Sequence, residues 1–193
     1  MNLHEDKTVF RNLVLSTAKE LKMEPAIVEK DYYLTLVLRN LEERIPGILC
    51  KGGTCLSKCF RLIHRFSEDI DLTLDCEHFT QGKKRAANKT VIEVCDNLGF
   101  PIKNRDLAES HSHGNYNCFL IQYPFCFEAA GITSELKLEM VFIHKAYPDE
   151  QSSVDSLMGE WLKQHHQDNI CSMYDLLPFP IRVCFLNKNH FKF

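Results

Sequence analysis

The sequence predicts a single α+β domain in which amphipathic helices pack on a sheet. Apolar residues recur at helical spacing over residues 6–21 and 84–98, as in helices with one buried face. Residues 67–75 and 134–142 instead alternate between apolar and polar side chains, which is the period of strands with one buried face. A chain of 193 residues with 45% hydrophobic residues can bury about 70% of its unfolded surface in one core.

Composition narrows the classes of protein to which the chain can belong. The net charge of −3 argues against non-specific coating of nucleic acid, so any site for a polyanion must be a local patch. The N-terminus lacks the apolar run of a signal peptide, and no stretch of 18 apolar residues predicts a membrane span. The nine cysteines contain no CxxC pair, which favours reduced thiols over disulfides or a zinc site. We therefore expect a cytoplasmic protein with no membrane partner.

Residues 1–46 are predicted to form two helices that pack on the core. The first covers residues 6–21, and the second runs from Pro25 to the Pro-Gly pair at residues 46–47. A charged triplet at residues 29–31 interrupts the apolar stripe of the second helix. Spacing alone favours solvent-exposed charges with weak i,i+4 ion pairs at this triplet.

The stretch over residues 51–75 holds most of the functional information. Gly52 and Gly53 follow a short apolar run that is predicted to be a buried strand, and they allow close approach of the backbone to a ligand. Thr54 suits the N-cap of a helix over residues 55–64. The N-terminus of a helix that carries lysine and arginine favours binding of an anion.

Asp69 and Asp71 lie on the predicted strand at residues 67–75, and the period of two points both side chains to the same face. Their Cα atoms would be about 6.7 Å apart, close enough for both carboxylates to bind one magnesium ion. On the second predicted strand, Lys137 and Glu139 share one face. Glu139 either completes a three-acid metal site or is an ordinary charge on an exposed strand face.

Charge is partitioned around the Asp-Ile-Asp strand. Residues 51–65 hold four bases and no acid, residues 68–77 hold five acids and no base, and residues 83–89 hold four bases and no acid. This distribution suits a carboxylate-bound metal with an anionic substrate held from both sides, although solvated surfaces also carry basic blocks.

The rest of the chain is predicted to alternate between helices and strands. A helix over residues 84–98 ends at Gly99. A polar loop holds His111 and His113, for which solvent exposure is favoured over metal binding. The later elements are two strands joined by a bend, a helix and a last strand, at residues 116–123, 134–142, 154–166 and 181–186.

One segment closely resembles the first motif of the nucleotidyltransferases of the AbiEii/AbiGii toxin family, a branch of the DNA polymerase β-like superfamily: KGGTCLSKCFRLIHRFSEDIDLTL. The resemblance includes the Gly-Gly-Thr, the Leu-Ser-Lys, the Arg-Phe-Ser and the Asp-Ile-Asp. The helix around Glu29, Lys30 and Asp31 is similar to the helix that precedes this motif in the family, which favours a role for Lys30 or Asp31. Glu139 is similar to the third acidic residue of the superfamily.

The resemblance implies a polymerase β-like nucleotidyltransferase fold, with a mixed, mostly antiparallel sheet backed by helices. It implies transfer of a nucleoside monophosphate from a nucleoside triphosphate to an acceptor, with Asp69, Asp71 and Glu139 as catalytic carboxylates that hold two magnesium ions, or manganese in their place. The acceptor would be an RNA end, such as that of tRNA. The protein would be a toxin of a bacterial toxin–antitoxin or abortive-infection system, with a cognate antitoxin as partner. The turn, hydroxyl and cationic residues expected at the triphosphate are Gly52, Gly53, Thr54, Lys58, Arg65, Ser67 and, as a weaker candidate, Lys137.

The chain departs from the family pattern after the last predicted strand, where the family continues into a Glu-Lys motif and a helical region. We therefore expect one domain over residues 1–193 that lacks the family's C-terminal helical region, binds magnesium and nucleoside triphosphate, and turns over slowly by itself. The alternative is a truncated, catalytically inactive homologue that acts as a nucleotide-binding or interaction module.

P-loop and dinucleotide-binding motifs are absent, and glycosyltransferases with an Asp-x-Asp motif need no Gly-Gly-Thr helix before it.

Overall fold

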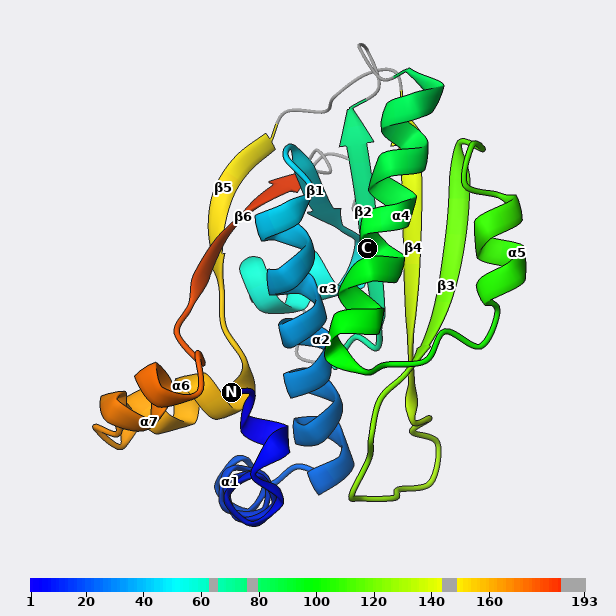
Figure 1. Cartoon of the computed structure of the whole chain (residues 1–193). Helices are drawn as coiled ribbons and strands as arrows, with labels where there is room; N and C mark the ends of the chain where they lie inside the picture. The colour runs from blue at the N-terminus through cyan, green and yellow to red at the C-terminus, as the bar shows by residue number, and fades with distance from the viewer. Residues whose placement is uncertain (63–65, 76–79, 144–148, 185–193) are drawn as a thin grey trace.

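The computed structural model describes residues 1–62, 66–75, 80–143 and 149–184, and over these residues it shows one six-stranded sheet with helices packed against it (Figure 1). The strands are β1 (Ile48–Lys51), β2 (Asp69–Asp75), β3 (Tyr116–Gln122), β4 (Glu135–Ile143), β5 (Asp149–Val154) and β6 (Phe179–Cys184). Their order in the sheet is β3-β4-β2-β1-β6-β5. The β2–β4 and β1–β6 pairs are parallel and the other three pairs are antiparallel. The α+β class and the mixed, mostly antiparallel sheet are therefore confirmed.

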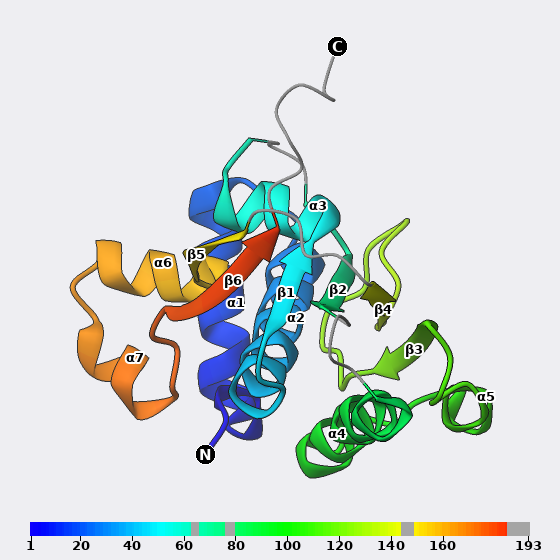
Figure 2. The same cartoon turned by 90° about the horizontal axis from the view of Figure 1, so that it is seen from above.

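Helices lie on both faces of this sheet. They are α1 (Lys7–Leu21), α2 (Pro25–Arg44), the short α3 (Gly52–Thr54), α4 (Gln81–Leu98), α5 (Arg105–Ser110), α6 (Leu157–Gln164) and α7 (Asp168–Met173). Viewed from above, α2 and α4 cover one face of the sheet while α3 lies on the other (Figure 2). No helix within the described ranges has both the length and the apolar character that a membrane span requires.

The two N-terminal helices form where the sequence predicts them. Asp6 caps α1 by accepting a hydrogen bond from the backbone N–H of Val9, and Phe10 and Val14 are buried beneath the helix. Pro25 opens α2, which ends at Arg44, close to the predicted stop. Both helices contribute residues to the core.

The alternation predicted for β2 is confirmed. Ile70, Leu72 and Leu74 have no exposed surface and belong to the core, whereas Asp69 is exposed and Asp71 is partly exposed. The core face is the one covered by α2 and α4, so the aspartates lie on the opposite face, where α3 is found (Figure 2). The sheet therefore separates the buried apolar side chains from the candidate catalytic ones.

Several boundaries differ from the sequence-based expectation. The helix expected over residues 55–64 instead begins at Gly52 with Lys51 in the N-cap position, and it continues only as a π-helical turn to Cys59. The N-cap prediction for Thr54 is wrong because its hydroxyl is bonded elsewhere, to the main chain of β2. The helix α4 begins three residues earlier than predicted, with Thr80 as its cap, and ends at Gly99 as predicted.

Three short elements were not predicted. Strand β5 has mostly exposed polar residues, so no apolar alternation marks it. Helices α5 and α7 are six residues long each, too short to display a helical period. The helix predicted at residues 154–166 occupies Leu157–Gln164, because Ser156 caps it.

The charged triplet at the start of α2 is buried, so the expectation of solvated charges is wrong. Glu29, Lys30 and Asp31 are only 1%, 1% and 2% exposed. Glu29 accepts hydrogen bonds from the backbone N–H groups of Cys126 at 2.7 Å and Phe127 at 3.0 Å. A buried carboxylate requires such donors because it has lost its water, and here they come from the loop between β3 and β4.

Lys30 connects the starts of the two strands that carry the acidic residues. Its Nζ lies 2.5 Å from a carboxylate oxygen of Glu68, directly before β2, and donates to the hydroxyl of Thr133 at 3.2 Å, two residues before β4. One buried cation thus holds the leading ends of β2 and β4 together.

Asp31 connects α2 to the π-helical turn that follows α3 and to the start of α6. One carboxylate oxygen lies 2.5 Å from Nζ of Lys58, and the other accepts the backbone N–H of Leu157 at 2.8 Å. Lys58 also donates to the carbonyl oxygen of Asp155 at 3.1 Å. The ion pair is nearly dry, since the side chains of Lys58 and Asp31 are 10% and 4% exposed.

Replacing Asp31 should therefore destabilise the fold strongly. Asp31→Ala leaves the Lys58 ammonium and the Leu157 N–H without their buried acceptor, and we expect the free energy of unfolding to fall by about 3 kcal/mol in urea titrations. The matched control is Glu160→Ala, which removes the partner of the largely exposed Arg61 and should cost about 0–1 kcal/mol. Equal losses in the two variants would contradict a structural role for the buried pair.

Candidate functional site

The candidate site is built on the parallel pair β2–β4. Asp71 and Glu139 are direct register partners in this pair, and Asp69 is the partner of Lys137. Neighbouring strands lie about 4.8 Å apart, so the two strands present three carboxylates and one ammonium on one small area of the sheet. Glu139 therefore lies on the strand next to the aspartates, as the sequence predicted.

Gly52 rests directly on the carboxylate of Asp71. The backbone there has φ +70°, and a Cβ built on Gly52 would lie 1.9 Å from Oδ2 and 2.7 Å from the carboxyl carbon of Asp71. Only glycine fits this position, because any side chain would displace the carboxylate. Similarly, a Cβ on Gly53 would lie 2.7 Å from the hydroxyl oxygen of Ser67. The two glycines let the α3 turn touch the start of β2.

Thr54 fastens this turn to the strand. Its side chain is 1% exposed, and its hydroxyl donates a hydrogen bond to the carbonyl oxygen of Asp69. The hydroxyl proton is thus committed to the main chain of the strand that carries Asp69 and Asp71. Thr54 fixes the height of the turn above both aspartates.

The carboxylates of the site have different proton affinities. Burial raises the pKa of Asp71, and the negative charge of Glu139 raises it further, while Lys51 acts in the opposite direction. The ion pair with Lys137 lowers the pKa of Glu139 and raises the pKa of Lys137. Asp71 therefore carries a charge that its surroundings disfavour, and a nearby cation would relieve that repulsion.

Lys51 is a site residue that sequence reasoning did not select. It is the last residue of β1, its register partner is Asp71, and its charge lowers the pKa of both Asp71 and Glu139. The available clue was its place directly before Gly52, within the basic block at residues 51–65.

The carboxylates fit a magnesium ion by donor type. Magnesium prefers oxygen ligands, and in proteins it is usually held by one or two carboxylates together with waters and substrate phosphates. Within the described part of the chain, no three His, Cys, Asp or Glu side chains lie close enough together to form a complete metal site. Glu139 instead points to Lys137. The arrangement therefore suits a metal that arrives with a phosphate ligand rather than one held by protein alone.

The other residues predicted at the triphosphate have different positions. Lys58 is engaged by Asp31, as described above, and so supports the fold next to the site. Ser67 lies beside Gly53 at the start of β2. Lys137 lies on the site face in contact with Glu139. Arg65 falls outside the described residues.

The second basic block does not flank the carboxylates. It lies on α4, which covers the opposite face of the sheet (Figure 2). Lys84 is buried and donates to the side-chain oxygen of Asn115, and Lys89 forms an exposed i,i+4 pair with Glu93. Lys84 therefore has a structural role, and Lys89 is an ordinary charge on a solvated surface. His111 and His113 are both exposed, as predicted.

One known family matches most of this chain. The sequence profile described as nucleotidyl transferase AbiEii toxin, type IV toxin–antitoxin system, matches residues 42–169, which is more than half of the chain. Among solved structures, the chain is similar to MenT4, a nucleotidyltransferase toxin from Mycobacterium tuberculosis H37Rv, with 19% identity and a TM-score of 0.42. That match covers 74% of this chain and 47% of MenT4, so the chain spans about half the length of that toxin. The search of curated proteins found no match.

Gly52→Ala should damage the site more than the backbone conformation alone explains. The new Cβ would displace the Asp71 carboxylate, whereas Gly99→Ala has nearly the same φ, +71°, with no atom within 4 Å of its Cβ. We expect Gly99→Ala to cost about 1–2 kcal/mol in urea unfolding and Gly52→Ala clearly more. If the two variants had equal stability, the close approach of Gly52 to Asp71 would be wrong.

Asp71→Asn should stabilise the protein at neutral pH. Because the pKa of Asp71 is raised above its ordinary value of 3.8, the folded state binds this proton more tightly than the unfolded state, and stability falls as the pH rises above 3.8. The neutral amide removes this penalty. The urea midpoint should be higher than that of the wild type at pH 7, and the difference should shrink as the pH approaches 3.8.

Asp69→Asn is the control for this pH series, because the Asp69 side chain is exposed and its replacement should change the midpoint little. A lower midpoint for Asp71→Asn at pH 7 would show that the Asp71 charge stabilises the fold, which would contradict the raised pKa of Asp71.

Proposed function

Since the chain belongs to the AbiEii nucleotidyl transferase toxin family, we propose that it transfers a nucleoside monophosphate from a nucleoside triphosphate to an acceptor at the carboxylates of β2 and β4. One observation carries this proposal: Gly52 is seated on Asp71 while Glu139 occupies the register position beside it. The Gly52-Gly53 pair, which has no side chains, then lies next to two neighbouring carboxylates. This is an arrangement that brings phosphates and a divalent cation together.

In this proposal Asp69, Asp71 and Glu139 hold divalent metal, with two magnesium ions, or manganese in their place, as the expected complement. Bound metal would neutralise charge on the triphosphate and lower the pKa of the attacking hydroxyl. The raised pKa of Asp71, which Glu139 helps to cause, supports the assignment because both carboxylates gain from a shared cation.

The triphosphate would lie against the α3 turn. The backbone N–H groups of Gly52, Gly53 and Thr54 and the hydroxyl of Ser67 would donate to its oxygens, because the two glycines permit close approach of the backbone. We propose that Lys137 turns from Glu139 to a phosphate when substrate binds, which frees the carboxylate for metal. Lys58 would act indirectly by fixing the turn through Asp31, and Arg65 stays a predicted phosphate contact.

The family assignment also bears on partners. We propose that the protein acts as a toxin of a type IV toxin–antitoxin system, that a cognate antitoxin exists, and that the acceptor is an RNA end, with tRNA as the first candidate. Asp69 is exposed and Asp71 is partly exposed, which supports the approach of an acceptor to this face of the sheet.

A second candidate function is a nucleotide-binding or interaction module without transfer activity. The observation in its favour is that two cations expected at the phosphates are paired with acids, Lys58 with Asp31 and Lys137 with Glu139. Such ion pairs would balance charge equally well in a protein that catalyses no reaction.

A transfer assay separates the two candidates. The purified chain is incubated with magnesium, total RNA and each labelled nucleoside triphosphate in turn, and incorporation of label into RNA is measured. Metal-ion catalysis contributes several kcal/mol, so Asp71→Asn and Glu139→Gln should each reduce incorporation about a thousandfold. Glu93→Gln is the control, since Glu93 lies on α4, on the opposite face of the sheet, and is paired with Lys89. Triphosphate binding without incorporation would favour the binding module.

A further inference from the structure

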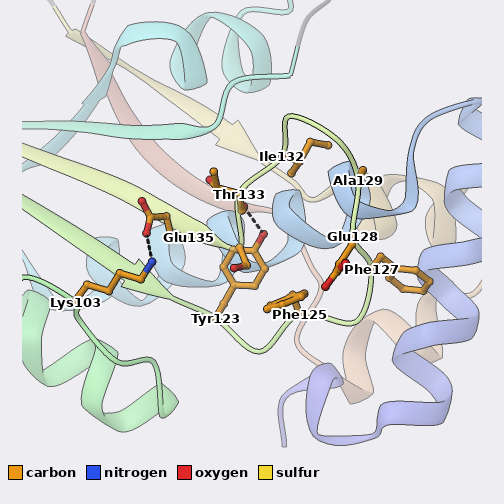
Figure 3. A pocket seen from close by; sticks show the side chains of 10 residues that line it. Lys103, Tyr123, Phe125, Phe127, Glu128, Ala129, Ile132, Thr133 and Glu135 are labelled. Atoms are coloured by element: carbon orange, nitrogen blue, oxygen red, sulfur yellow. Dashed lines mark hydrogen bonds and ion pairs between the residues drawn. The ribbon is translucent and has the colours of Figure 1, made fainter.

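An open cavity of about 500 Å³ lies beside the loop that connects β3 to β4 (Figure 3). Its wall combines aromatic, aliphatic and polar side chains: Lys103, Tyr123, Phe125, Phe127, Glu128, Ala129, Ile132, Thr133, Ser134 and Glu135. None of these residues is among the predicted catalytic or phosphate-binding residues. The volume falls in the range of small-molecule sites, about 300–1,000 Å³.

The loop that forms this cavity is held in place by buried charges. Glu29 accepts the backbone N–H groups of Cys126 and Phe127, and Lys30 donates to the hydroxyl of Thr133. Tyr123 donates its hydroxyl to the carbonyl oxygen of Thr133 at 3.2 Å, across the mouth of the loop (Figure 3). A long loop with this many interior contacts is preorganised, which lowers the entropy cost of binding a ligand.

Phe125 offers an aromatic face to this cavity. It is 47% exposed, and no ring or cation among the described residues stacks on it. The neighbouring aromatics are already in use: Tyr123 stacks on Tyr33 with ring centroids 4.6 Å apart, and Arg11 lies 4.8 Å from the Phe127 ring. Exposure of a large apolar ring is costly in water, so a stacking ligand would be favoured here.

Charge selects the kind of ligand. The ionised side chains of the wall are Lys103, Glu128 and Glu135, which sum to one negative charge. Lys103 and Glu135 form an ion pair at 2.7 Å on the side of the cavity away from Phe125 and Phe127 (Figure 3). A phosphate would be repelled by this wall, whereas a neutral planar group would stack on Phe125 and form hydrogen bonds with the polar rim.

The cavity lies within one nucleotide's reach of the carboxylates. Glu135 opens β4 and shares its face with Glu139, four residues further along the strand. At about 3.3 Å per residue, their Cα atoms are about 13 Å apart. A base in the cavity can therefore belong to a nucleotide whose reacting group lies at Asp71 and Glu139.

We propose that this cavity binds a nucleobase of one of the two substrates, the triphosphate or the acceptor strand, by stacking on Phe125. This inference rests on the proposed function, because the nucleotide chemistry of the neighbouring site motivates it. Stacking on an aromatic ring is tolerant of base identity, so the cavity positions a nucleotide more than it selects one.

The test measures binding, so it does not require turnover. Wild type, Phe125→Ala, Phe125→Trp and the control Leu107→Ala, which truncates an exposed apolar residue on α5, are titrated with two probes. One probe is each magnesium–nucleoside triphosphate, with magnesium–tripolyphosphate as its base-free control. The other is a short single-stranded RNA, with copies in which one base at a time is removed.

We expect Phe125→Ala to weaken binding of one probe about tenfold, Phe125→Trp to retain it, and Leu107→Ala to change neither. In the affected probe, removing the stacked base should weaken binding to wild type but not to Phe125→Ala. Loss for the triphosphate identifies the donor base, and loss for the RNA identifies an acceptor base.

Loss for neither probe, for both, for tripolyphosphate, or equally in Leu107→Ala would overturn the proposal. If Phe125→Ala weakened binding of one probe as expected but the wild type showed no transfer activity, the result would count against the proposed function alone. Normal transfer with an unaffected Phe125→Ala protein would count against the nucleobase site alone.

Discussion

Three consecutive buried charges at the start of α2 are the constraint on which the rest of the structure depends. A charged side chain without water must find a partner, because the penalty for an unpaired buried charge is several kcal/mol. The partners of Glu29, Lys30 and Asp31 lie in three different places: the loop after β3, the leading ends of β2 and β4, and the helices next to the α3 turn. One helical turn of α2 thereby connects three of the segments that lie around the candidate site. The candidate catalytic face and the cavity beside the β3–β4 loop share this support, since Lys30 contacts both Glu68 and Thr133.

The site itself opposes the stability of the fold. Asp71 and Glu139 are neighbours with like charge, and Asp71 is also partly buried beneath the Gly52 turn. Neither feature stabilises the folded chain, so both must be maintained by packing elsewhere, chiefly the apolar face of β2 and β4 against α2 and α4. The same features are useful for chemistry, because they keep two carboxylates together until a cation and a substrate arrive. Asp71 and Glu139 are only partly buried, so ligands can reach them.

The sequence predicts the strands of the site well because their information is local. Strict alternation in β2 and β4 determines which side chains face the core, and a parallel pair in register then brings Asp71 beside Glu139. The sequence does not predict what the cations do. Lys58 follows the glycine turn at a position suited to a phosphate, yet its partner is Asp31, and no spacing rule relates residues so far apart in the chain. The sequence does not predict burial of the charged triplet either, because its partners are distant in the chain and only the folded structure brings them together.

The parallel pairing of β2 with β4 also determines when the site can form. The hydroxyl of Thr73 bonds to the carbonyl of Val141, 68 residues later, and all of α4, α5 and β3 lie between them in the chain. Closing so long a loop has an entropy cost that is recovered only after the intervening segments have folded, and pairings of this kind form slowly. During synthesis, a nascent chain that ends before β4 carries both aspartates but lacks the strand that brings Glu139 to them. The candidate site is thus complete only after β4 has paired with β2, and a chain that ends earlier carries two of its three proposed carboxylates.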